Sequence, residues 1–393
     1  MPFRLALFAL FALFALTIAA VLVAAAPAAA NRGGPVRVNE LQVIGTHNSY
    51  KREISEAEQA VYEAAIDTPG DYDRFLAYSH AALPRQFERQ GVRGLELDLF
   101  GDPAGGLYAS PLVRQAAGLG PLTDPAWQQP GIKVLHIADL DYNSTCIRFV
   151  TCLDQVRDWS ATHRDHVPLL ILLELKQSDS RAVAAGGVTA PAWNADALDA
   201  LDAEIRSVFS ERHLLTPDDI IRRGRTLEES VLRHGWPRLA ASRGKVAFLL
   251  DNEPGPIRDA YTAGRPNLEG RVLFTNSRPG FSDAAFIKRN DPLGANTAQI
   301  QGLVRKGYLV RTRADLPLET VKSADTSLLE AALASGAHVV STDFPVTGMS
   351  ARYDTDYVAE LPGGAVARCN PVSARAWCRS GWLGPIRWTS GAD

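Results

Sequence analysis

The sequence predicts an α/β protein with a (β/α)8 TIM-barrel fold, and three observations support this fold class. The chain has 393 residues, a length that suits one large barrel with a sizeable core. After residue 30, apolar runs of strand length recur, and stretches with helical periodicity separate them. The eight expected strands are residues 41–46, 92–99, 132–138, 168–175, 245–250, 272–276, 308–313 and 338–342.

Helical patterns fill the intervals between these strands. The expected helices are residues 55–65, 75–90, 152–164, 195–209, 298–306 and 326–335. A doubly wound open sheet is the alternative, but no Gly-rich phosphate-binding turn follows the first strand. We expect residues 31–352 to form the barrel and residues 353–393 to form an extension that packs on it.

Residues 1–30 form a targeting segment rather than part of the fold. Arg4 supplies a positive start, a long apolar run follows, and Ala28-Ala29-Ala30 resembles a signal-peptidase site. The alternative is a retained membrane anchor, because the run is long enough to span a bilayer. We therefore expect a secreted or periplasmic protein that has no transmembrane segment after cleavage of this signal peptide.

The net charge argues against nucleic acid as a partner, and the cysteines are consistent with an oxidising compartment. A formal net charge of −3, with scattered Arg and Lys, provides no electrostatic basis for binding nucleic acid. Four cysteines allow three pairings, and proximity in the chain favours Cys146 with Cys152 and Cys369 with Cys378. Export makes disulfides more plausible than buried thiols. The second pair lies in the extension.

Three carboxylates interrupt strands that should be almost continuously apolar. Glu96 and Asp98 alternate with leucines in RGLELDLF, so they share the inward face of the second strand. Glu174 occupies a similar position in PLLILLELK. With the amide oxygen of Asn48 they form an all-oxygen set, which suits Ca²⁺ or Mg²⁺. The alternative is that each carboxylate pairs with an Arg or Lys of the barrel.

Histidines at strand ends are the second group of candidates. His47 follows the first strand in LQVIGTHNSY, and His136 ends the third in KVLHIAD. Together they could flank a bound phosphate opposite the metal, although a lone strand histidine is more often a satisfied core residue. His80 precedes the helix that leads to the second strand, where it caps that helix or reaches the rim.

Residues of the later strands add charge near the same rim. Arg311 and Arg313 share a face of the seventh strand, and fork-shaped guanidinium groups suit phosphate. Asp343 ends the eighth strand. The alternative is a ring of Arg and Asp that only holds the loops. The Gly- and Pro-rich residues 101–131 follow the second strand and are expected to form a lid or rim over the mouth of the barrel.

Six motifs in order support a family resemblance. They are THNSY, GVRGLELDLF, KVLHIADLD, LLILLELK, GYLVRTRAD and AHVVSTDFP. Between residues 39 and 346 the chain resembles the secreted bacterial Ca²⁺-dependent phosphatidylinositol-specific phospholipases C, which are PLC-like phosphodiesterase barrels. The resemblance implies that His47 lies against the phosphate. It also implies that calcium is held by Asn48, Glu96, Asp98 and Glu174.

The resemblance leaves the second catalytic histidine open. The family offers positions that match either His136 or His80, and strand-end geometry favours His136. We expect the inositol 2-hydroxyl to attack phosphorus while diacylglycerol leaves. Glu174 or His47 would act as base, a histidine would act as acid, and Lys176 and Arg313 would bind the inositol or its phosphate.

Two rival functions remain at this point. A glycerophosphodiester hydrolase uses the same barrel, but its first strand typically ends in His-Arg-Gly where this chain has His-Asn-Ser. A secreted Ca²⁺-dependent lipid-binding protein without turnover is the rival from another class. For the phospholipase and for the lipid-binding protein, the expected partner is a phospholipid at a membrane surface. We expect Tyr108, Trp127 and neighbouring leucines of residues 101–131 to touch that surface, and we expect a monomer.

Overall fold

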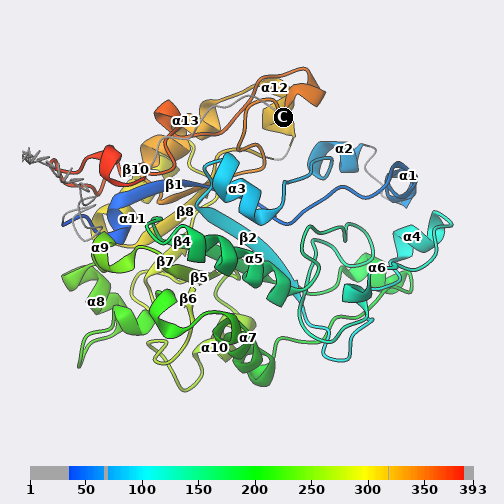
Figure 1. Ribbon diagram of the computed structural model, residues 1–393, viewed down its shortest axis with the longest axis horizontal. Helices are drawn as coiled ribbons and strands as arrows, with labels where there is room; N and C mark the ends of the chain where they lie inside the picture. The colour runs from blue at the N-terminus through cyan, green and yellow to red at the C-terminus, as the bar shows by residue number, and fades with distance from the viewer. Residues whose placement is uncertain (1–34, 66–69, 317, 385–393) are drawn as a thin grey trace, which may run out of the picture.

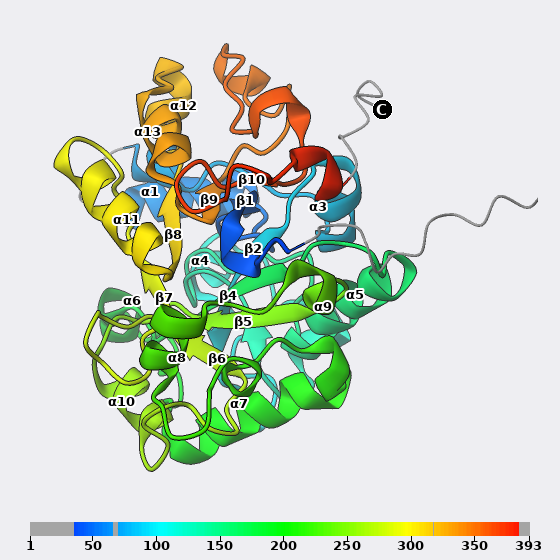
Figure 2. The same cartoon turned by 90° about the vertical axis from the view of Figure 1, so that its left-hand side faces the viewer.

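The computed structural model describes residues 35–65, 70–316 and 318–384, and parallel strands form a nearly closed barrel at its centre (Figure 1, Figure 2). The expected signal peptide, residues 1–30, lies outside the described residues. Neighbouring strands follow the order β6-β5-β4-β2-β1-β9-β8-β7, and a parallel bridge from Asn276 to Phe286 links the two end strands. The strands are β1 (Leu41–Thr46), β2 (Gly94–Phe100), β4 (Leu169–Leu175), β5 (Val246–Leu250), β6 (Leu273–Thr275), β7 (Phe286–Lys288), β8 (Leu309–Arg313) and β9 (Val339–Thr342).

The predicted barrel is confirmed, but one expected strand is wrong and one barrel strand was not predicted. Residues 132–138 do not form a barrel strand. Strand β3 (Lys133–Val134) instead pairs antiparallel with the last two residues of β2. This segment is apolar because Leu135 and Ala138 are buried in a cluster beside the rim. The eighth barrel strand is instead β7, which the sequence pattern missed because it has only three residues and the last of them is Lys288.

Helices cover the outside of the barrel and one of its ends. In Figure 2, α3, α5, α7, α11 and α13 surround the strands. In Figure 1, α1, α2, α4 and α6 gather beyond the arrowhead of β2, at the end where the active-site loops of such barrels lie. No described helix is both long and apolar enough to cross a membrane. The helices are α1 (Glu56–Ala65), α2 (Asp71–Phe75), α3 (Leu83–Arg89), α4 (Leu112–Ala116), α5 (Phe149–Thr162), α6 (Ser180–Ala184), α7 (Ala195–Val208), α8 (Leu227–His234), α9 (Leu239–Ser242), α10 (Pro256–Thr262), α11 (Ala295–Lys306), α12 (Glu319–Ser323) and α13 (Ser327–Ser335).

The single helix expected over residues 75–90 is wrong. Helix α2 ends at Phe75 and α3 begins at Leu83, so residues 76–82 run between them without helical structure. The main chain of this segment is tied to the chain that follows β1, because His80 N donates to Lys51 O at 2.9 Å. The break therefore brings Tyr78 and His80 to the rim, where an uninterrupted helix would have carried them past it.

Residues 101–131 pack against the rim rather than exposing their aromatic side chains. Tyr108 and Trp127 are each 3% exposed. Tyr108 meets the ring of Phe100 edge-on at 5.5 Å, and Trp127 meets Tyr142 at 6.1 Å. The expectation that these two residues touch a lipid surface is therefore wrong: aromatic rings in this segment bury their area inside the protein.

The last described residues return to the start of the barrel. Strand β10 (Arg368–Cys369) pairs antiparallel with the first residues of β1, and Arg368 Nε donates to Gln42 Oε1 at 2.7 Å. Both predicted disulfides are confirmed, one joining Cys146 to Cys152 and the other joining Cys369 to Cys378. The second disulfide closes the chain just after β10, so it braces the segment that pairs with β1.

Two glycines allow β1 and β2 to approach closely. Gly45 and Gly94 are partners across this strand pair. A Cβ added to Gly45 would lie 2.8 Å from Val339 Cγ1 and 3.3 Å from the Gly94 Cα. A contact of 2.8 Å is too short for carbon atoms, so a side chain here requires movement of β9. The close approach sets the spacing of the strands that deliver residues 47 and 48 and residues 96 and 98.

We expect Gly45→Ala to lower the free energy of unfolding by about 1–3 kcal/mol, because the new methyl group overlaps Val339. Replacing Val339 by Ala removes the clashing atom, so the double variant should be more stable than the sum of the single changes predicts. Urea unfolding in a double-mutant cycle measures this coupling. Gly302→Ala in α11, where no atom lies within 4 Å, is the control and should be neutral or stabilising by up to about 1 kcal/mol. Strict additivity of the Gly45 and Val339 changes would contradict the proposed overlap.

Candidate active site and metal centre

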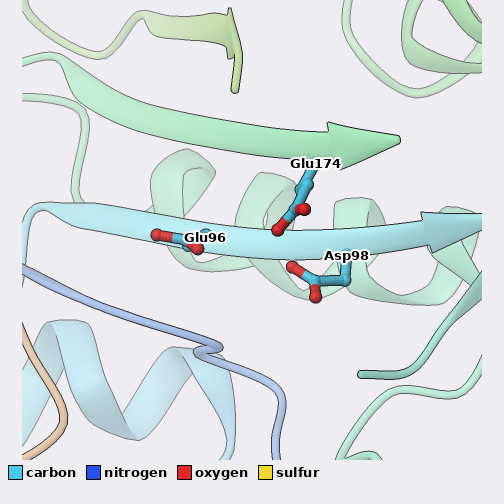
Figure 3. Close-up of side chains that lie close together, drawn as sticks. All are labelled: Glu96, Asp98 and Glu174. Carbon is cyan, nitrogen blue, oxygen red and sulfur yellow. The ribbon is translucent and has the colours of Figure 1, made fainter. Parts of the chain in front are cut away.

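Three carboxylates meet at the carboxyl ends of β2 and β4. Asp98 and Glu174 are partners across the parallel pair, and Glu96 lies two residues earlier on the same face of β2. One ligand oxygen from each residue lies within 4.8 Å of the others. Figure 3 shows the Asp98 and Glu174 side chains directed toward one another, with Glu96 further back along the strand. The sequence prediction that these three residues converge is confirmed by this geometry.

The cluster concentrates negative charge that the protein only partly compensates. Asp98 is fully buried, and Lys176 Nζ lies 3.2 Å from its Oδ2 and 3.3 Å from Glu174 Oε1. Neither oxygen of Asp98 accepts a well-directed hydrogen bond from the described residues. Burial raises the pKa of Asp98 well above its ordinary value, and Glu174 and Glu96 raise it further, against Lys176. A hard divalent cation fits this oxygen set and would satisfy the buried carboxylate.

Glu96 carries an additional partner that the sequence did not assign to it. Arg311 Nη2 lies 2.5 Å from Glu96 Oε2 and 3.1 Å from Ser341 Oγ, and Arg311 is 3% exposed. Its guanidinium group therefore lies inside the barrel, bonded to these two residues, and is not exposed at the rim. Arg311 thus pairs with Glu96, and Lys176 lies beside Asp98 and Glu174, so each of the three carboxylates has a cationic neighbour, as the alternative expected.

Asn48 adopts a left-handed backbone conformation directly after β1. Its φ is 45°, a value that Asn tolerates better than most residues, and the residue is buried. Its Nδ2 donates to the Tyr78 hydroxyl at 3.2 Å. The next residue, Ser49, exchanges hydrogen bonds with the main chain of Glu96 at 2.9 and 2.8 Å. Asn48 is thus held beside β2, with its amide oxygen as the group that a cation could use.

His47 is held through one ring nitrogen by Asp343. The Nδ1 atom lies 3.0 Å from Asp343 Oδ1, while Nε2 lies 3.7 Å from Glu96 Oε1. Burial opposes ionisation of Asp343, but His47, His80 and Arg313 outweigh it and hold its pKa well below the usual range. Because that carboxylate is ionised, the proton of neutral His47 belongs on Nδ1. Burial, assisted by Arg313, lowers the pKa of His47 against the influence of Asp343 and Glu96.

Arg313 lies between His47 and Asp343. Its Nη2 is 3.1 Å from Asp343 Oδ2, and its Nη1 is 3.4 Å from His47 Nε2. The guanidinium is mostly buried, and its Nε has no partner among the described residues. Asp343 therefore supports His47 and Arg313 together. Part of the expected ring of Arg and Asp exists here, but it includes a histidine that faces the carboxylate cluster.

His136 forms a second pair of the same kind. Its Nδ1 lies 2.8 Å from Asp141 Oδ2, and no described residue bonds to its Nε2. Burial lowers the pKa of His136 even though Asp141 raises it. The residue lies in a tight turn after β3 rather than on a barrel strand, so its expected position at the end of a barrel strand is wrong. The turn still borders the site, because Leu135 N donates to Asp98 O at 3.3 Å.

His80 has a different setting from the other two histidines. Its Nε2 donates to the main-chain oxygen of His47 at 2.9 Å and lies 3.8 Å from Asp343 Oδ1. The side chain is fully buried, and Nδ1 has no hydrogen-bond partner in the part of the chain that the structure describes. This geometry fixes the backbone of His47, and it leaves His80 less accessible to a substrate than His136.

Sequence reasoning missed three residues that support the site. Asp141 holds His136, and Lys51 Nζ, fully buried, lies 3.3 Å from the same carboxylate. Tyr78 OH lies 3.4 Å from His47 Nδ1 and accepts the hydrogen bond of Asn48. The only signal for Asp141 was a second acidic residue in HIADLD, five positions after His136. Nothing in the local pattern of YSHAALPRQF distinguished Tyr78 from a core aromatic residue.

Comparison with family models identifies one family. Residues 36–371 match the model described as phosphoinositide phospholipase C, Ca²⁺-dependent. No curated protein matches the chain.

Solved structures provide a likeness of fold. A calcium-dependent phosphoinositol-specific phospholipase C from a Pseudomonas species has a TM-score of 0.50 and 16% identity, over 86% of this chain and 96% of that one. The Ca²⁺-dependent enzyme from Streptomyces antibioticus has a TM-score of 0.48 and 18% identity, over 81% and 98%. A phosphatidylinositol-specific phospholipase C from Listeria monocytogenes has a TM-score of 0.45 and 10% identity, over 84% and 97%.

The family match covers most of the chain and agrees with the six motifs and with the barrel. The resemblance inferred from those motifs is therefore confirmed. This chain belongs to the Ca²⁺-dependent phosphoinositide phospholipase C family.

Proposed function

We propose that the protein cleaves phosphatidylinositol by attack of the inositol 2-hydroxyl on phosphorus, which releases diacylglycerol and a cyclic inositol phosphate. The observation that carries this proposal is the pair of histidines, His47 and His136, each held through Nδ1 by an aspartate and each bordering the carboxylate cluster. A phosphodiester cleavage of this kind needs one group to accept a proton and another to donate one. The cyclic product could then be opened by water in the same site.

Family membership makes calcium the expected cofactor. We infer that Glu96, Asp98, Glu174 and Asn48 hold it, because the donor set is all oxygen and Asp98 is buried without a well-directed donor. When bound, the ion supplies positive charge that lowers the pKa of a nearby hydroxyl and neutralises phosphoryl oxygens. Lys176 and Arg313 would add fixed positive charge for the phosphate or the inositol.

His47 is our first choice for the base. Its lowered pKa keeps the imidazole neutral near pH 7, and its Nδ1 proton is engaged by Asp343, so Nε2 is the atom that accepts a proton. The positive charge formed on the ring would be stabilised by Asp343 and opposed by Arg313. Glu174, with its side chain 34% exposed, is the other candidate, although its Oε1 already lies 3.3 Å from Lys176 Nζ.

His136 is our choice for the acid that protonates the departing glycerol oxygen. Its Nε2 is not engaged by any described residue, and its side chain is 18% exposed. Burial lowers the pKa of His136, and Asp141 opposes this effect by stabilising the protonated ring that the role requires. His80 is less suited, because its Nε2 is committed to the His47 carbonyl and its side chain is fully buried.

We propose that the enzyme acts as a monomer outside the cytoplasm. Its two disulfides are typical of an oxidising compartment. Exposed leucines follow two barrel strands at the catalytic end: Leu293 in the loop after β7 is 43% exposed, and Leu316 after β8 is 51% exposed. These are better candidates for contact with a phospholipid surface than the buried aromatic residues of 101–131.

Direct analysis of the products tests the proposed function. Phosphorus NMR of the protein with phosphatidylinositol and Ca²⁺ should show a cyclic inositol phosphate, and diacylglycerol should appear in the organic phase. Activity confined to the deacylated lipid, with release of glycerol phosphate, would identify a glycerophosphodiester hydrolase instead. Binding to liposomes without any product at saturating Ca²⁺ would indicate the lipid-binding alternative.

Asp98→Asn should weaken Ca²⁺ binding at least tenfold, about 1.4 kcal/mol, and lower diacylglycerol release to a similar extent at limiting Ca²⁺. The change removes one charge from the cluster but keeps the size of the side chain. Calorimetric titration with Ca²⁺ measures the first effect. Asp251→Asn is the matched control, because Asp251 is a buried rim carboxylate that pairs with Lys288 at 2.6 Å outside the cluster. Full activity of the wild-type protein in chelator would rule out this metal centre.

His136→Ala should lower the rate on phosphatidylinositol by about 10²–10⁴-fold, the usual contribution of a general acid. On a substrate with a nitrophenolate leaving group the loss should largely disappear, since that group departs without a proton. His80→Ala should instead reduce both rates by a similar factor, because it loosens the backbone of His47. If the activated substrate rescues His80→Ala and leaves His136→Ala impaired, the two assignments must be exchanged.

A further inference from the structure

A hollow lies at the end of the barrel opposite to the carboxylate cluster. Its volume is about 780 Å³, within the range of small-molecule sites. Arg93 lines it directly before β2, and Val167 lines it two residues before β4, so it borders the ends of the strands away from the arrowheads of Figure 1. Trp159 of α5 and Leu383 of the returning chain complete its apolar wall.

Arg93 is a buried cation without a negative partner. It is 6% exposed, and its Nη1 donates to the carbonyl oxygens of Phe87 and Val92 at 2.9 and 2.7 Å. Its Nε is buried and has no hydrogen-bond partner, and no carboxylate among the described residues pairs with it. Burial lowers the pKa of Arg93 to about 10. A buried charge of this kind lowers the stability of the folded protein unless an opposite charge is supplied.

The neighbouring side chains add donors and positive charge. The guanidinium carbon of Arg93 lies 5.1 Å from the centre of the Trp159 ring, and His163 stacks on that ring at 4.4 Å. The Trp159 Nε1 is buried without a partner. Arg164 and Arg243 also line the hollow. Among the described residues of this lining, Asp165, 3.6 Å from Arg243, is the one carboxylate.

The pKa of His166 is affected by the positive charges around the hollow. It lines the hollow, is 7% exposed, and is held by Ser160 Oγ at 2.7 Å and by the carbonyl of Val167 at 2.6 Å. Burial lowers its pKa to about 4; the Val167 carbonyl opposes this, and the positive charges of Arg93 and Arg243 add to it. The ring is therefore neutral at pH 7, and the positive potential of the hollow comes from its arginines.

We propose that this hollow binds a small organic anion, a phosphate or sulfate ester that also carries an apolar group. The anionic group would meet Arg93 and the arginines at the opening, since guanidinium groups suit phosphate and sulfate oxygens. The apolar group would lie on Trp159, Val167 and Leu383. Arg93 is too deeply buried to reach a flat membrane surface, which favours a ligand that enters the hollow.

Phenyl phosphate is a suitable probe, and titration calorimetry with the full chain should show one site outside the catalytic rim. Arg93→Met should weaken this binding at least tenfold, about 1.4 kcal/mol, and leave phosphatidylinositol cleavage unchanged. His163→Glu should have the same effect by placing a negative charge at the edge of the hollow, and unlike Arg93→Met it changes an exposed residue. Arg305→Met in α11, outside the hollow, is the control and should bind as the wild type does.

Three results would overturn this proposal. Binding that is unchanged in both Arg93→Met and His163→Glu would place the phosphate elsewhere, most simply at the catalytic rim. Equal affinity for phenol would show that the hollow does not select an anion. No binding of phenyl phosphate to the full wild-type chain would show that the hollow takes no anion of this class.

Discussion

The site depends on the parallel pairing of β2 with β4, which aligns Asp98 with Glu174 inside the barrel end. The register forces carboxylates together where burial penalises their charge, so neighbouring groups must compensate. Lys176 supplies one cation and Arg311 another, yet Asp98 still has no well-directed donor. The unmet requirement explains why a divalent ion fits this position and why the surrounding residues are so polar. The Gly45–Gly94 contact then brings β1 close enough for residues 47 and 48 to join the cluster.

The two histidine–aspartate pairs are built by different parts of the backbone, one by two neighbouring strands and the other by a single turn. His47 and Asp343 come from the ends of adjacent parallel strands, β1 and β9, so the sheet itself brings them together. His136 and Asp141 come from one tight turn that is anchored on β2. The first pair is rigid because both strands are buried. The second pair depends on buried Lys51, whose Nζ lies 3.3 Å from Asp141 Oδ2. This contact joins the turn to the chain that follows β1.

Period-two alternation was enough to predict the carboxylate cluster, because strand geometry fixes which face a residue occupies. The same reasoning misassigned residues 132–138, since burial in a side cluster produces an apolar run as readily as a barrel strand does. It missed β7 because three residues are too few to show a pattern. The break at residues 76–82 and the support by Tyr78 and Asp141 depend on contacts between segments distant in sequence or on the details of a turn. Local patterns do not encode such contacts.

The two ends of the barrel pose the same physical problem with opposite signs. At the carboxyl ends of the strands, Asp98 is a buried anion without a well-directed donor; at the amino ends, Arg93 is a buried cation without an acceptor of opposite charge. Burial of either group opposes folding, so each is more easily understood when a ligand supplies the missing charge. If the unpaired charge of Asp98 favours a bound cation at the carboxyl ends of the strands, the unpaired charge of Arg93 favours a bound anion at their amino ends. The two ions would bind at separate ends of one rigid barrel, where occupancy of either site stabilises the folded chain.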